Sequence, residues 1–219
     1  MKKVFVPIIL FLLFALQSKT QTQTDSLLLS LQDTTPKASL LPSRMVFTQR
    51  FLWGRKGLMR TTGIMKLNEE NRKTELKIRR AMLTTHQIMG YVTLAGMVAQ
   101  GIVGQSLYNT LGGKVYKKGG PGRSLNEIHG ALATGVDITY FTTAALSLFA
   151  PPPLSNRKTT KINSIKIHKY LAIVHFSSML AVNILASYAR QNPTIRTYHL
   201  AAAYTAFTAF GLSVIVMKF

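Results

Sequence analysis

Five histidines are the side chains in this sequence best suited to chemistry, since its 219 residues include no cysteine and only seven Asp or Glu. Four of them, His86, His129, His168 and His199, each lie near the start of a separate apolar stretch. The fifth, His175, follows His168 by two helical turns. Neutral imidazole binds transition metals and haem iron, and a histidine within a membrane span is a functional candidate by default. The absence of cysteine excludes disulfides, thiolate nucleophiles, iron–sulfur clusters and covalently attached haem.

Four apolar stretches, at 81–108, 124–150, 167–188 and 193–219, must position these histidines. At about 1.5 Å per helical residue, each is long enough to cross a hydrocarbon core of roughly 30 Å. Asn68, followed by two glutamates, predicts the N-cap of a helix that runs into the first stretch. A capping box (SLNE) begins the second stretch, three prolines end it, and an Asn-Pro pair begins the fourth. The sequence therefore predicts an all-α integral membrane four-helix bundle.

The four histidines are predicted to lie at matching depths, because each is followed by about 20 residues before its stretch ends. Successive spans run in opposite directions, which places His86 with His168 near one membrane surface and His129 with His199 near the other. Two axial imidazoles from facing helices bind a haem iron. We therefore expect two non-covalent haems, one at each level, close enough for electron tunnelling. His175 is an alternative to His168 as the ligand from the third span.

Two other interpretations of these histidines stay open. The rings could make only interhelical hydrogen bonds, in which case the chain would be a haem-free structural membrane subunit. His175 and Asp137 could instead bind a divalent metal in a transporter, which is disfavoured because Asp137 is the one carboxylate deep within a predicted span. Asp137 could also hydrogen-bond His175 or carry a proton.

Basic residues outnumber acidic ones by 27 to 7, for a net charge of +20. They lie between the apolar stretches rather than within them. This segregation is typical of loops that meet anionic lipid head groups, whereas a nucleic-acid-binding protein needs a basic face on a folded surface. We therefore expect a lipid bilayer and no nucleic acid as the partner, with homo-oligomerisation left open.

The amino-terminal 80 residues precede the predicted four-span domain, residues 81–219. Residues 1–20, with two lysines before an apolar run, are typical of a secretory signal peptide, either cleaved or kept as an anchor. Residues 21–80 are predicted to form a polar linker and then a basic amphipathic segment on the membrane surface, with Trp53 at head-group depth. A solvated basic arm is the alternative. An exported amino terminus indicates a bacterial inner membrane, although the basic segment then conflicts with the positive-inside tendency.

The segments HQIMG at 86–90, IHG at 128–130 and IHKY at 167–170, together with His199, resemble the four-helix haem core of the cytochrome b561 family. The resemblance covers roughly residues 80–219. It implies that the first and third helices hold one haem b, that the second and fourth hold another, and that electrons cross the membrane through them. A transmembrane oxidoreductase is implied by analogy, with no donor or acceptor indicated. Many members of that family have six spans, whereas here only the amino-terminal apolar run could add a fifth.

Overall fold

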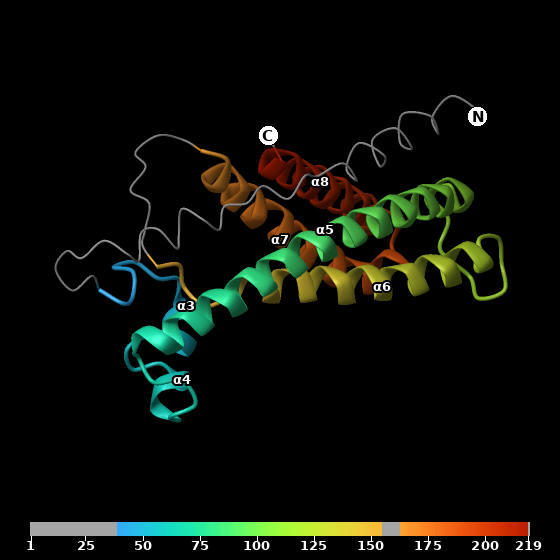
Figure 1. Cartoon of the computed structure of the whole chain (residues 1–219). Coiled ribbons are helices and arrows are strands. Elements are labelled where there is room, and N and C mark those ends of the chain that lie inside the picture. The colour runs from blue at the N-terminus through green and yellow to red at the C-terminus, as the bar shows by residue number, and fades with distance from the viewer. Residues whose placement is uncertain (1–38, 155–162, 219) are drawn as a thin grey trace. The chain divides into compact units, whose positions relative to one another are not determined.

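The computed structural model describes residues 39–154 and 163–218, and the predicted signal peptide lies outside these ranges. Regular structure in the described residues is entirely helical (Figure 1): α3 (Phe47–Trp53), α4 (Leu58–Thr61), α5 (Glu69–Leu111), α6 (Arg123–Leu148), α7 (Ser164–Ala189) and α8 (Pro193–Lys218). The described chain divides into two compact units, unit 1 with residues 39–83 and 147–154 and unit 2 with residues 84–146 and 163–218. Helix α5 continues through the boundary.

Three helices of the described chain, α5, α7 and α8, are long and apolar enough to cross a membrane. Large apolar side chains on α7 face outward, with Ile173 and Ile184 being 64% and 65% exposed. Such surface is unfavourable in water and favourable against lipid, so the chain is an integral membrane protein. Helix α6 has the same 26-residue length as α7 and α8, but it is less apolar because it carries Glu127, Asp137 and several threonines. Composition therefore supports three of the four predicted spans.

One buried core joins the four long helices of unit 2. It comprises Leu94 and Met97 of α5, Val136 and Tyr140 of α6, Met179 of α7, and Ala206 and Phe210 of α8. The two residues from each of α5, α6 and α8 are three or four positions apart, so these helices each turn one stripe of side chains toward the core.

Two predicted helix caps are confirmed. The side-chain oxygen of Asn68 accepts a hydrogen bond from the Asn71 amide at 2.8 Å, which satisfies one of the free N–H groups at the start of α5. The side-chain oxygen of Asn192 accepts one from the Ile195 amide at 3.2 Å, with Pro193 as the first residue of α8.

The capping box predicted at Ser124 is wrong. Helix α6 begins one residue earlier, at Arg123. Glu127 accepts a hydrogen bond from Arg123 Nε at 2.9 Å instead of reaching back to the helix start, because the guanidinium is a charged donor one turn away.

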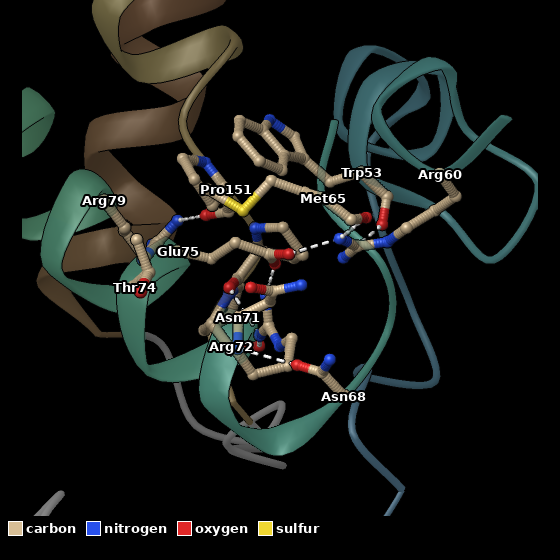
Figure 2. A network of polar contacts seen from close by, with 12 residues as sticks. Trp53, Arg60, Met65, Asn68, Asn71, Arg72, Thr74, Glu75, Arg79 and Pro151 are labelled. Atoms are coloured by element: carbon tan, nitrogen blue, oxygen red, sulfur yellow. Dashed lines mark hydrogen bonds and ion pairs between the residues drawn. The ribbon is translucent and has the colours of Figure 1, made fainter. Parts of the chain in front are cut away.

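Unit 1 is organised around buried charges (Figure 2). The carboxylate of Glu75 on α5 is fully buried and pairs with Arg60 of α4 and with Arg72, one turn earlier on α5. Arg72 is 2% exposed and also donates to the carbonyl oxygen of Pro152 at 3.1 Å. Arg79 donates to the oxygen of Pro151 at 2.7 Å. Proline lacks an N–H but keeps its acceptor, so these arginines attach the proline segment to α5 through its carbonyl groups.

Trp53, predicted at head-group depth on an amphipathic surface, does not face lipid. Its side chain is 5% exposed and its Nε1 donates to the oxygen of Phe149 at 3.0 Å, so the indole fills the interior of unit 1. Thr48 Oγ1 donates to the oxygen of Leu148 at 2.6 Å. The basic segment therefore folds into two short helices, of which α3 is attached to the chain that follows α6.

Replacing Glu75 by glutamine should destabilise unit 1 by about 3–5 kcal/mol, because Arg60 and Arg72 would stay buried without a counter-ion. Trp53 is the only tryptophan in the sequence, so its fluorescence during urea unfolding in detergent reports on unit 1. Glu70→Gln changes an exposed glutamate of the same helix and is the control, with an expected change within about 0.5 kcal/mol. Superimposable unfolding curves for the two variants would contradict a stabilising role for the buried carboxylate.

Candidate functional site

The structure brings the four predicted ligand histidines together as two pairs of rings. His86 on α5 lies beside His168 on α7, with ring centroids 6.2 Å apart and ring planes at 84°. His129 on α6 lies beside His199 on α8, with centroids 6.4 Å apart and planes at 77°. All four side chains are partly buried. Each pair joins the helical hairpin α5–α6 to the helical hairpin α7–α8.

Three of these rings are also fixed within their own hairpin by a bond from Nδ1 to a main-chain carbonyl oxygen. The bonds run from His86 to Thr143 at 2.8 Å, from His168 to Ser213 at 3.1 Å and from His199 to Val182 at 3.0 Å. A carbonyl oxygen can only accept, so Nδ1 carries the proton and the neutral ring keeps its lone pair on Nε2. Such a bond is the usual support of a metal-bound imidazole, and it leaves Nε2 free to bind.

His129 is held differently. Its Nε2 lies 3.4 Å from Nε2 of Gln100, and its Nδ1 is buried with no hydrogen-bond partner in the described chain. The ring fits because residue 104 on α5 is glycine, since a Cβ at Gly104 would lie only 2.8 Å from Cε1 of His129. An amide nitrogen can only donate, so Nε2 of this ring accepts, and the proton of the neutral ring lies on Nδ1, beside Gly104.

The contacts within the hairpins share one register. Each of the four helices carries a ligand candidate histidine and, fourteen positions later, a residue that contacts the histidine of the other helix in its hairpin. These residues are Gln100 after His86, Thr143 after His129, Val182 after His168 and Ser213 after His199. At about 1.5 Å per residue, the two histidine levels are about 21 Å apart along the helices. The two hairpins therefore repeat the same antiparallel arrangement, and both levels fit within one bilayer core.

His175 lies halfway between the two levels on α7. It is buried, its Nδ1 is 2.6 Å from the hydroxyl of Tyr140, and its ring centroid is 5.1 Å from that of Phe210. Of the two candidates on this helix, it is His168 that the structure places in ring contact with His86.

Asp137 does not contact His175. It accepts a hydrogen bond from Asn183 Nδ2 at 3.1 Å, so the possible hydrogen bond between Asp137 and His175 is not formed. Within the described ranges, no three His, Cys, Asp or Glu side chains come together as a metal-binding group. The arrangement therefore offers pairs of imidazoles and no carboxylate-containing cluster.

Sequence reasoning missed two residues that hold histidines, Tyr140 and Gln100. Tyr140 follows His129 by eleven residues, which is three helical turns, and Gln100 follows His86 by fourteen, about four turns. Each therefore shares a helix face with a candidate ligand, and this spacing was the available signal. Gly104 is one of several glycines in its span, and the sequence does not show which side chain needs the space.

The comparisons with known proteins give no match. No family model, no curated protein and no solved structure is similar to this chain at a significant level. The resemblance to the cytochrome b561 family therefore rests on the histidine-bearing segments and their order along the chain.

Proposed function

We propose that this chain transfers electrons across a membrane through two haems of the b type, one bound by His86 and His168 and the other by His129 and His199. The observation that carries the proposal is the pairing of imidazole rings from alternate helices at two levels. The proposal includes α6 as a fourth span, an exported amino terminus behind a signal peptide at 1–20, and a bacterial inner membrane as the location.

The separation within each pair suits one iron between two imidazoles. A metal–imidazole bond is about 2.0 Å, so two rings that point at one metal ion from opposite sides have centroids about 6 Å apart. The observed separations are 6.2 Å and 6.4 Å. The same separations and steep interplanar angles also fit direct edge-to-face contact of the rings, which is what a haem-free subunit would show.

The number of ligands favours haem over a bare metal ion. A divalent ion such as zinc is held by three or four protein ligands, and the described chain offers no group of three. Two axial imidazoles suffice for haem, because the porphyrin supplies the remaining four nitrogen ligands. When bound, haem iron accepts and releases one electron at a time.

Small residues next to the ligands leave room for a flat group. Gly90 lies one turn after His86, and Gly130 directly follows His129. A Cβ built at either glycine meets no atom within 4 Å. Nε2 of His129 would become available to a ligand by giving up its 3.4 Å contact with Gln100.

The other polar groups of unit 2 have roles that do not need haem. The carbonyl groups of Thr143, Ser213 and Val182 orient three imidazoles and fix their proton on Nδ1. These same hydrogen bonds are what a haem-free structural subunit would show, so that function is the second candidate. The two candidates differ in whether the free ring nitrogens bind anything.

Full-length protein produced with a haem supply and purified in mild detergent should contain two haems per chain, measured by pyridine haemochrome assay against protein concentration. His86→Ala should lose one haem and keep the other, because the second pair is about 21 Å away along the helices. The double variant His86→Ala with His129→Ala should bind none. Folded wild-type protein without a haem band in its reduced-minus-oxidised spectrum would favour the structural subunit.

Gly104→Ala should reduce haem occupancy at the His129–His199 pair at least several-fold while the other haem stays, because the added methyl group would overlap the His129 ring. Gly101→Ala on the same helix is the matched control, since a Cβ there meets no atom within 4 Å. Haem content and potentiometric titration of both variants provide the test. Full occupancy in Gly104→Ala would show that His129 does not need its observed position to bind.

His175→Phe should keep both haems, because His175 is bonded to Tyr140 and it is His168 that faces His86. Phenylalanine fills a similar volume beside Phe210 without a ligating nitrogen. Haem stoichiometry is the measurement, and His168→Phe is the companion variant that should lose one haem. The reverse outcome, with one haem lost on replacing His175 and both kept on replacing His168, would reassign the ligand of α7.

A further inference from the structure

Unit 1 exposes large apolar side chains on and beside its two short helices. Its side chains, which we call the α3–α4 face, are Val46, Phe47, Phe51, Leu58 and Ile64, between 46% and 80% exposed. Phe47 and Phe51, one helical turn apart, stack with ring centroids 6.4 Å apart. Exposed aromatic side chains on a folded unit indicate a contact surface.

The face is held outward by contacts made elsewhere on α3. Trp53 is buried and bonded to the carbonyl oxygen of Phe149, and Thr48 is bonded to that of Leu148. These bonds fix the rotation of the helix about its axis. Phe47 and Phe51 therefore cannot turn inward without breaking them.

Basic residues are frequent in the same segment. Residues 44–80 contain eleven Lys or Arg against three Glu, and the one buried glutamate, Glu75, is already paired with Arg60 and Arg72. Exposed basic residues near the apolar side chains in sequence include Arg50, Arg55, Lys56 and Lys66. The surface thus combines exposed phenylalanines with a positive charge.

We propose that the α3–α4 face inserts between the head groups of an anionic lipid leaflet, with arginines and lysines of the same segment paired to lipid phosphates. Exposed aromatic side chains combined with basic ones are typical of segments that lie in a membrane interface. Anionic lipids supply the complementary charge. The helix that begins in unit 1 continues without a break into a membrane-capable stretch, which tethers the face to the bilayer. This proposal does not depend on haem binding.

The absence of cysteine allows a direct test. Full-length Phe47→Cys, labelled with an environment-sensitive nitrobenzoxadiazole dye, is reconstituted into nanodiscs of phosphatidylcholine alone or mixed with phosphatidylglycerol. We expect blue-shifted emission in the mixed nanodiscs, and quenching by head-group nitroxide lipid at least twofold stronger than in phosphatidylcholine. Thr74→Cys is the control, an exposed site on α5 that Figure 2 draws on the other side of Glu75 from Arg60. Its dye should stay water-like in both lipids.

The contribution of charge is tested with Arg50→Glu and Arg55→Glu in the labelled chain. These substitutions should abolish the difference in dye emission and quenching between the two kinds of nanodisc. The fluorescence of buried Trp53 should stay unchanged, which shows that unit 1 is still folded. Equal quenching of the wild-type face in both lipids would overturn the anionic preference. A dye at position 47 that is shielded from water but not quenched by nitroxide lipid would show that protein, including a second copy of this chain, covers the face. A water-like dye in both nanodiscs would rule out insertion.

Discussion

The bond between a histidine ring and a main-chain carbonyl of the neighbouring helix is the interaction on which unit 2 depends. In apolar surroundings an imidazole N–H without an acceptor is costly, and a helical carbonyl has a second lone pair available after its own helix bond is made. His86, His168 and His199 each use one. A shift of one residue would turn the accepting carbonyl away by about 100°. The same bond therefore fixes the depth of the ring, its orientation and which nitrogen is free.

Contacts within a hairpin orient the histidine rings, whereas contacts between hairpins bring the rings together in pairs. The carbonyl bonds lie within α5–α6 or within α7–α8, so each hairpin orients its own two rings. Packing of the hairpins through the shared apolar core then brings His86 to His168 and His129 to His199. Tyr140 and His175 satisfy each other inside that core, where either would otherwise be a buried polar group without a partner.

Much of unit 2 could be predicted from the sequence because its signals are local. Length and apolar composition predict the helices, and the Asn caps at 68 and 192 fix two of their starts. The depth of each histidine follows from its distance to the end of its stretch, so the two levels could be anticipated. The partner of each ring could not. Whether Asp137 or Tyr140 meets His175 depends on rotation about the helix axes, which is decided by packing between helices that are distant in sequence.

The sequence by itself determined the helical character of this protein, the membrane affinity of its apolar stretches and the order of its histidines, because all three depend on neighbouring residues. Only the tertiary structure decided that Trp53 is buried, since its acceptor at Phe149 lies 96 positions away, and that Arg72 loses its access to water beside Pro152. The sequence around a basic or amphipathic residue does not show whether a carbonyl group far along the chain will replace its contacts with water. A polar group is buried at low cost only where the fold supplies hydrogen-bond partners for it.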